Sequence, residues 1–382
     1  MQTTKIIKRW YLWQTIMQLL ITTADMILFN NNSATLAFFF IILEFTQLID
    51  TVIQPLNNYF QVFISIFTIP QSLAIITKFT RKFHLINLDF AVTITILYLL
   101  IAFIPITKLA ISQIKSTLGR FFILFIIFSG IDPRGLTIHC SSWLIALTSS
   151  GFTNAILFTI VALVAMHEWN FQLPQFKISK QTNAKVILLI IIFITADCFF
   201  NGFNQATNWN NLVTNWNFHF KAFNLMMLLS GVKAGIREEI LIRFCTLSLL
   251  LKPFDHKHWL RQILRTIIIS SMLFGLLHLF NIIAGQSVTA SIQQAINAFC
   301  SGIVFAAIYL YTNSILVTII YHSIFDLAAF VTSNQIIMPV PTTFDLQETI
   351  LFCIIYLIFA CFLLSGKRKN VILLNLKERK LA

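Results

Sequence analysis

Two adjacent carboxylates, Glu238 and Glu239, lie about midway along an apolar run from Ala222 to Leu251. A charged side chain at membrane depth costs on the order of 2.5–3.5 kcal/mol on insertion scales, so it marks a functional site by default. Arg243 follows at i, i+4 spacing, where it can neutralise or orient Glu239. Glu238 is turned by about 100° toward a neighbouring face of the same helix. We therefore expect the two glutamates to have different partners.

Two later pairs have the same i, i+4 spacing: Phe274 with His278, and His322 with Asp326. Together with the glutamates they could hydrolyse a peptide bond in two ways. Without a metal, a carboxylate and a histidine activate water, while the second histidine and a polar partner stabilise the oxyanion. With a metal, Glu238, His278 and His322 would hold Zn²⁺, which lowers the pKa of bound water to about 7. Zinc is the one cofactor that these residues suggest, and both routes stay open at this point.

The composition of the chain shows that these residues lie in a membrane protein. The 382-residue chain is 57% hydrophobic and only 11% charged, with a mean hydropathy of +0.81, whereas a soluble domain has roughly 25% charged residues. The apolar runs are about 20 residues long, which favours helices over barrel strands. We predict an all-α, polytopic transmembrane helical bundle of roughly ten spans (8–12) in the cell membrane, with membrane lipid as a partner.

The net charge of +13 comes from Lys and Arg residues at the ends of the apolar runs. That distribution is the positive-inside pattern, so we expect no nucleic-acid partner. The linker 170–185, the loop 252–265 and the C-terminal tail are all basic, and an even number of predicted spans separates them. We therefore expect all three, and hence the C-terminus, to be cytoplasmic.

The chain is expected to have three parts. Residues 1–185 form a transmembrane region that carries no motif, residues 186–335 hold the three pairs, and residues 336–382 contain the last span and the basic tail. A short turn at residues 312–314 should separate two of the spans in the second part. Lone acids in other apolar runs are expected at span ends or in helix contacts, and they could line a transport path. They are Asp25, Glu44, Asp50 and Asp197.

Glu-Glu-x-x-x-Arg, Phe-x-x-x-His and His-x-x-x-Asp, in that order on successive apolar helices, resemble the CPBP family. This family contains CAAX prenyl proteases and bacteriocin-processing or self-immunity enzymes, and it is also called the Abi family. The resemblance covers about residues 186–335. It implies an all-α intramembrane endopeptidase, a hydrolase of the glutamic or the metalloprotease type.

The resemblance also implies a role for each residue. Glu238 would activate water with the help of His278, and His322 with Asp326 would form the oxyanion hole. Glu239, Arg243 and Phe274 would support them. The prenyl proteases often have Asn where this chain has Asp326, and an ionised Asp cannot donate a hydrogen bond. Asp326 must then be protonated, orient His322, or ligate a metal.

The function expected from these features is cleavage of a small membrane-associated peptide or protein, either prenylated or bacteriocin-like, by a bacterial enzyme. Bacteriocin processing and self-immunity are the expected settings. Two alternatives compete with it. In one, the site is a structural ion-pair network, with Arg237 and Arg243 around the glutamates, in a non-enzymatic immunity or scaffold protein. In the other, the intramembrane acids carry protons or cations in a transporter.

Overall fold

The structure is a computed structural model that describes residues 2–29, 32–49, 53–221, 223–252 and 258–379, so Asp50 and Ala222 lie outside the described residues. Within these ranges the regular structure is helical, apart from an isolated bridge between Asn204 and Trp216. Eight of the described helices are long and apolar enough to cross a membrane, or nine if a bent pair is counted as one span. The predicted all-α, multi-pass membrane fold is therefore confirmed.

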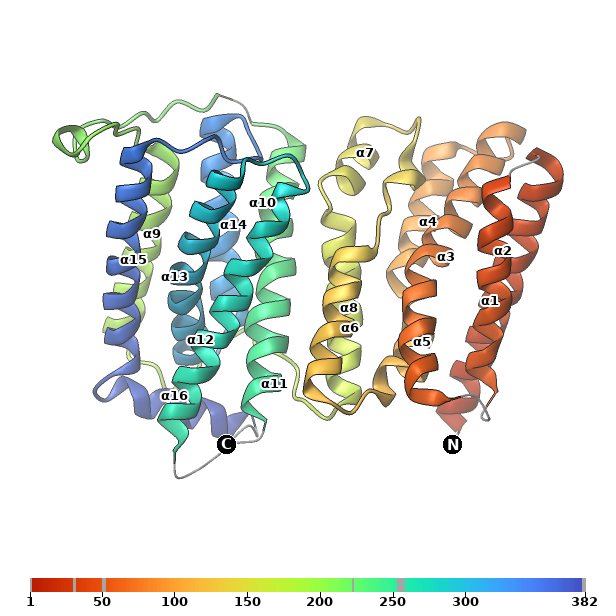
Figure 1. Ribbon diagram of the computed structural model, residues 1–382, viewed down its shortest axis with the longest axis horizontal. Helices are drawn as coiled ribbons and strands as arrows, with labels where there is room; N and C mark the ends of the chain where they lie inside the picture. The colour runs from red at the N-terminus through yellow and green to blue at the C-terminus, as the bar shows by residue number, and fades with distance from the viewer. Residues whose placement is uncertain (1, 30–31, 50–52, 222, 253–257, 380–382) are drawn as a thin grey trace. The chain divides into compact units, whose positions relative to one another are not determined.

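The chain divides into two compact units, residues 1–173 and 174–382. The described residues of the first unit form eight α-helices, which run from red to yellow in Figure 1: α1 (Gln2–Phe29), α2 (Asn32–Glu44), α3 (Gln54–Phe83), α4 (Leu88–Ala102), α5 (Ile104–Leu109), α6 (Thr117–Gly130), α7 (Ser142–Ser149) and α8 (Phe152–Glu168). Between α7 and α8 the chain bends by 51°. Gly151 supplies the positive φ of 79° that this bend requires.

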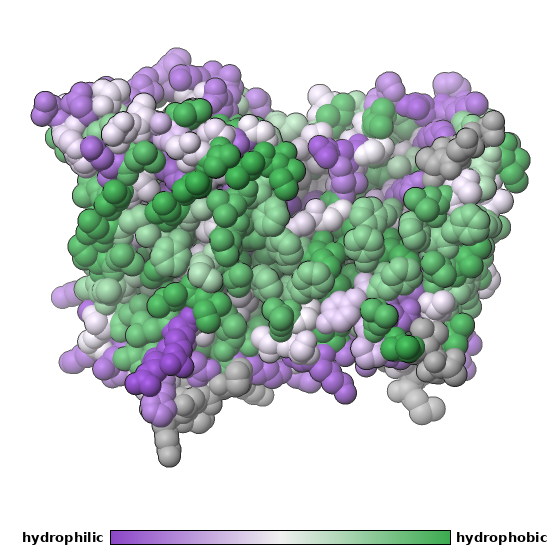
Figure 2. All heavy atoms as spheres, in the orientation of Figure 1, coloured by the Kyte–Doolittle hydropathy of each residue, from purple (hydrophilic) through white to green (hydrophobic). Residues whose placement is uncertain are grey.

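The second unit begins with α9 (Ala184–Phe203) and ends with α16 (Arg368–Glu378), and it is coloured green to blue in Figure 1. Between them lie α10 (Leu225–Glu239), the π-helical segment η5 (Ile240–Thr246), α11 (Leu247–Leu251), α12 (Trp259–His278), α13 (Val288–Thr312), α14 (Ile315–Ser333) and α15 (Thr343–Leu364). The predicted turn at 312–314 is confirmed. The viewer-facing side of this unit is hydrophobic over its middle and hydrophilic at both ends (Figure 2).

One continuous helical segment, α10 with η5 and α11, carries the glutamate pair. It runs from Leu225 to Leu251, so at 1.5 Å per residue it is about 40 Å long, enough to cross a bilayer. The Asn224 side chain caps its start by accepting a hydrogen bond from the Met227 N–H. It is not among the eight candidate spans, and the five charged residues between positions 233 and 243 set it apart from ordinary spans.

The three basic stretches of the second unit lie at one end of its helices. The linker meets the end of α13, where the Ser179 N–H donates to the Thr312 carbonyl oxygen at 2.8 Å. The tail helix α16 reaches the same place, since Asn375 Nδ2 donates to the Leu310 carbonyl oxygen at 3.0 Å. The end of α11 and the start of α12 are at this end too (Figure 1). The predicted basic loop 252–265 is shorter than expected, because α12 begins at Trp259.

Glycines allow the site-bearing helices to approach closely. A Cβ on Gly235 would lie 2.5 Å from the Ile319 carbonyl oxygen and 2.9 Å from the Ser323 nitrogen of α14. Gly231, one turn earlier, faces Leu327 of the same helix. This is the small-xxx-small spacing that brings membrane helices together. Gly275 does the same for α12 and α13, because its Cβ would lie 2.6 Å from the Ala295 carbonyl oxygen.

We predict that Gly235→Val will separate α10 from α14. Besides the Ser323 hydroxyl, its side chain would meet two backbone atoms of α14. No rotamer change relieves the clash with the backbone, and overpacking of this kind costs about 1–3 kcal/mol. The measurement is thermal unfolding of the purified protein in detergent. Gly135→Ala is the matched control, since its Cβ would only reach ordinary contact with Ala74 at 3.9 Å. Equal stability of the two variants would contradict the prediction.

Candidate active site

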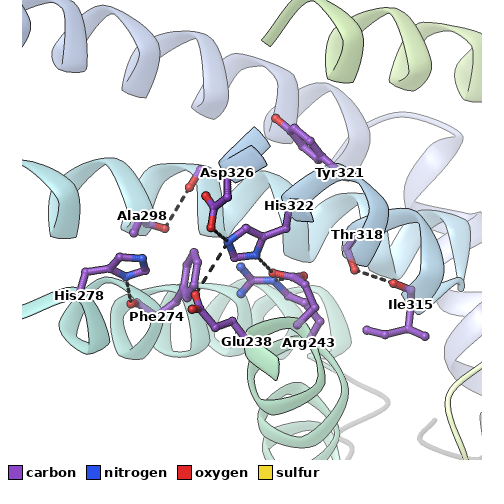
Figure 3. Close-up of polar contacts among 12 residues, drawn as sticks. Glu238, Arg243, Phe274, His278, Ala298, Ile315, Thr318, Tyr321, His322 and Asp326 are labelled. Carbon is purple, nitrogen blue, oxygen red and sulfur yellow. Dashed lines mark hydrogen bonds and ion pairs between the residues drawn. The ribbon is translucent and has the colours of Figure 1, made fainter. Parts of the chain in front are cut away.

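The second unit brings the three sequence-predicted pairs into one region (Figure 3). Glu238, Glu239 and Arg243 come from α10 and η5, Phe274 and His278 from α12, and His322 and Asp326 from α14. Local helical spacing sets each pair, and the glycine contacts between α10 and α14 bring two of the pairs together.

Glu239 joins the first pair to the third. One of its oxygens accepts a hydrogen bond from Arg243 Nε at 3.2 Å, and the other accepts one from His322 Nδ1 at 3.1 Å. The side chains of Glu239 and Arg243 are both fully buried. Because the carboxylate accepts at Nδ1, that nitrogen carries the proton, and the Nε2 of His322 is left to face the open part of the site.

Two further carboxylates face the Nε2 of His322. Glu238 Oε2 lies 3.8 Å from it and Asp326 Oδ2 lies 3.7 Å from it. These are ion-pair distances, too long for direct hydrogen bonds. The Glu238 and Asp326 side chains are 17% and 26% exposed, whereas that of Glu239 is 0% exposed. A water molecule or a substrate oxygen placed among the three groups could contact all of them.

Two phenylalanine rings enclose the buried cation and the imidazole. Phe274 contacts the His322 ring edge to face at 5.7 Å, and Phe305 of α13 stacks on it at 5.3 Å. The Arg243 guanidinium lies 4.8 Å and 5.5 Å from the same two ring centroids. Its Nη atoms have no hydrogen-bond partner among the described residues, and the ring faces are what stabilises its charge there. Phe305 could not be singled out from the sequence, because one phenylalanine among 39 carries no signal.

His278 lies on the other side of Phe274 from His322 in Figure 3. Its Nδ1 donates to the Phe274 carbonyl oxygen at 2.9 Å, one turn earlier on α12. A carbonyl can only accept, so Nδ1 carries the proton of the neutral ring and the Nε2 lone pair is available as a base. The ring packs edge to face on Phe274 at 4.9 Å. His278 is thus near the cluster, with an aromatic ring between it and His322.

The set expected to bind zinc, Glu238, His278 and His322, is not assembled as a metal site. Within the part of the chain that the structure describes, no three His, Cys, Asp or Glu side chains could hold a metal ion. A metal role for these residues stays a prediction.

A cavity of about 460 Å³ lies beside the cluster. Its walls include His278, His322 and Asp326, and α13 contributes Gln293, Asn297 and Ser301. Further wall residues, at positions 204, 221 and 335–339, belong to the connections at the end of the helices opposite the basic stretches (Figure 1). The cavity therefore connects His278, His322 and Asp326 to that end of the second unit.

Asp197 of α9 also lines this cavity. It is buried and accepts hydrogen bonds from the hydroxyls of Tyr321 at 2.6 Å and Tyr356 at 2.9 Å. It therefore ties α9 to α14 and α15, which is the helix-contact role expected for it. Tyr321 directly precedes His322, so this tie also holds the backbone that carries the imidazole.

We predict that Glu239→Gln will destabilise the second unit by about 3–5 kcal/mol, because it leaves the Arg243 guanidinium buried without its counter-charge. Replacing both partners, as in Glu239→Gln with Arg243→Met, should cost less than the sum of the single changes. Thermal unfolding in detergent measures both. Asp132→Asn is the control, since the Asp132–Arg134 pair is exposed and worth only about 0–1 kcal/mol. Additive losses in the double variant would show that the two side chains act independently.

Comparison with known families agrees with this geometry. Residues 220–328 match the family described as type II CAAX prenyl endopeptidase, Rce1-like. The matched stretch contains all three pairs, from Glu238 to Asp326. Neither the curated proteins nor the solved structures gave a match. The site-bearing part of the second unit is thus similar to the type II CAAX prenyl endopeptidases, which confirms the resemblance to the CPBP family.

Proposed function

We propose that the second unit is an intramembrane endopeptidase that cleaves a membrane-associated peptide or protein. The observation that carries this proposal is the arrangement of Glu238, His322 and Asp326 around one point beside the cavity, with His322 fixed by a buried carboxylate. A structural ion-pair network of the two glutamates with Arg237 and Arg243 would account for the buried Glu239–Arg243 pair. It would not account for two partly exposed carboxylates that face the same nitrogen of His322.

Glu238 is the proposed general base. Its carboxylate is partly exposed, and it has room beside His322 Nε2 for a water molecule. It would take a proton from that water as the oxygen attacks the peptide carbonyl carbon, and it would then return the proton to the leaving amine. His278 would assist through its free Nε2, which is the only nitrogen of its ring that is not engaged by its own helix.

His322 is the proposed oxyanion stabiliser. Glu239 fixes the ring from behind through Nδ1, so a proton on Nε2 points toward the space between Glu238 and Asp326. A donor held in this way costs little reorganisation when negative charge develops on the substrate oxygen. For Asp326 we propose the orienting role, because an ionised carboxylate 3.7 Å from Nε2 favours the protonated imidazole without donating a hydrogen bond.

The proposed substrate class follows from the similarity to prenyl endopeptidases. It is a peptide with a prenylated cysteine near its C-terminus, presented from the bilayer, and the enzyme would be of the glutamic type. Bacteriocin processing or self-immunity remains the alternative setting for the same reaction. A non-enzymatic immunity role is a different function, and the variants below separate it from catalysis.

We predict that Glu238→Gln lowers kcat by about 10²–10⁴-fold, the usual contribution of a general base. His278→Gln should lower it as well, and neither variant should change the thermal stability as Glu239→Gln does. The assay is cleavage of a quenched fluorescent peptide that ends in a farnesylated Cys-aliphatic-aliphatic-X sequence, with the protein in liposomes.

Asp132→Asn is the matched control, because it removes one exposed carboxylate from the first unit. The same peptide without the prenyl group tests the substrate class. Full activity of the folded Glu238→Gln and His278→Gln variants would contradict the catalytic proposal. If the wild-type protein is folded but cleaves neither peptide, the prenyl-peptide form of the proposal is wrong.

We also propose that the basic end of the second unit, with the C-terminus, faces the cytoplasm, following the positive-inside rule. A green fluorescent protein fused after residue 382 should therefore be fluorescent in bacterial cells, and an alkaline phosphatase fused there should be inactive. The opposite pair of results would place the basic end outside. In the proposed orientation the cavity opens on the non-cytoplasmic side.

A further inference from the structure

In the first unit, two membrane-spanning helices face each other with polar side chains. Along α1 the residues Tyr11, Thr15, Gln18, Thr22 and Asp25 are all buried. Their spacing alternates between four and three residues, which is the a/d spacing of a coiled-coil seam. Such a seam is normally apolar. Here the seam is polar from one end to the other, although the helix is long and apolar enough to cross a membrane.

The facing helix α3 has the matching pattern. Asn58, Gln61, Ser65, Thr68 and Ser72 follow one another at three- and four-residue intervals, and all five are buried. We call the two rows together the polar seam. From Asn58 to Lys78 the seam is about 30 Å long at 1.5 Å per residue, which is the thickness of the hydrocarbon core.

Two contacts fix the register of the helices. The Tyr11 hydroxyl lies 3.3 Å from Gln61 Oε1, and Lys78 Nζ lies 2.6 Å from Asp25 Oδ1. The offset between partners is 50 residues in the first contact and 53 in the second. The helices therefore run in the same direction, and the polar residues between the two contacts lie level with each other.

Glu44, from the end of α2, enters the seam. It is buried, and its Oε1 accepts a hydrogen bond from the Thr68 hydroxyl. The Tyr11 hydroxyl also lies 3.1 Å from the Glu44 carbonyl oxygen. The ionisable groups around the seam are Tyr11 and Asp25 on α1 and Lys78 on α3, with the Asp25–Lys78 pair at one end. The carboxyl group of Glu44 is thus a proton acceptor partway along the seam.

Helix packing alone does not account for this seam. Polar residues that hold membrane helices together do so by bonding to each other. In the seam and beside it, Gln14 Oε1, Gln18 Oε1, Thr22 Oγ1 and Ser65 Oγ are buried but have no hydrogen-bond partner among the described residues. Each such group costs about 1–3 kcal/mol unless it is satisfied. Buried groups of this kind are usually satisfied by ordered water.

Both ends of the seam reach polar surroundings. A cavity of about 270 Å³ adjoins the Asp25–Lys78 pair, and Gln71 and Arg81 also line it. At the other end Gln61 Nε2 donates to the hydroxyl of Thr46, a partly exposed residue, at 2.6 Å. Hydrogen-bonding groups therefore continue from a cavity at one end to the surface at the other.

We propose that the polar seam of the first unit conducts protons, and that Glu44 is its proton-binding group. A proton enters from the cavity beside Asp25 and Lys78, passes along water and the hydroxyls of Thr22 and Thr68, and binds the Glu44 carboxylate. It leaves past Tyr11 toward Thr46, and Glu44 returns to its ionised form. This activity is separate from the peptide cleavage proposed for the second unit.

The test is proton flux into liposomes that contain the full chain, with pyranine inside and a potassium diffusion potential set by valinomycin. Wild-type protein should acidify the lumen faster than protein-free liposomes do. Glu44→Gln should bring the rate down to that background, because an amide cannot take up the proton. Glu168→Gln is the matched control: it removes an acid that pairs with Lys108 outside the seam, and it should leave the flux unchanged.

Gln18→Leu and Thr22→Val provide a second pair of variants that keep the Glu44 carboxyl group and should reduce the flux by drying the seam. Thermal unfolding of each variant in detergent shows that the chain is folded. This control does not depend on peptide cleavage, so failure of the peptidase proposal and failure of this one are distinguishable. Wild-type flux at the protein-free level would overturn the proposal and leave the seam a packing device. Glu44→Gln flux equal to that of the wild type would overturn the role of Glu44.

Discussion

The second unit depends on one carboxylate, that of Glu239. Its two oxygens are divided between Arg243 on its own helix and His322 on α14. A buried charge is tolerated only when it is paired and hydrogen-bonded, and here a single anion pairs with a buried guanidinium and orients an imidazole. The close contact of α10 with α14 at Gly231 and Gly235 allows the carboxylate to reach the ring. Removing the anion would therefore affect stability and site geometry together.

In the site, the supporting side chains are fully buried and the proposed reacting carboxylates are partly exposed. Glu239 and Arg243 are fully buried, and the rings of Phe274 and Phe305 lie against the Arg243 guanidinium, whereas Glu238 and Asp326 are partly exposed. Consecutive glutamates on a helix point in directions about 100° apart, which places one in the protein interior and the other in the site. The first unit shows a different use of buried polarity, since its polar side chains extend across the whole thickness of the unit and do not converge on one point.

The sequence predicted what depends on local spacing. The i, i+4 pairing of Glu239 with Arg243, the different surroundings of Glu238, the membrane class and the all-α fold all follow from hydropathy and helical period. Contacts between helices could not be predicted in this way. The bond from His322 to Glu239, the ring of Phe305 and the position of His278 behind Phe274 are set by tertiary packing. From the sequence, Asp25 and Glu44 were only isolated acids. The polar seam could not be predicted, because the residues that face each other across it are about 50 positions apart.

The π-helical segment Ile240–Thr246 follows Glu239 directly. A π turn amounts to one residue inserted into an α-helix, and such insertions are often found at functional sites. The length of chain between the glutamates and α11 is therefore one residue greater than an α-helix of the same rise would need. This extra residue sets the rotation of α11 about the helix axis relative to α10. A chain that lost one residue here would keep its helix and its hydropathy, yet it would present the far half of the helix to its neighbours with a different face.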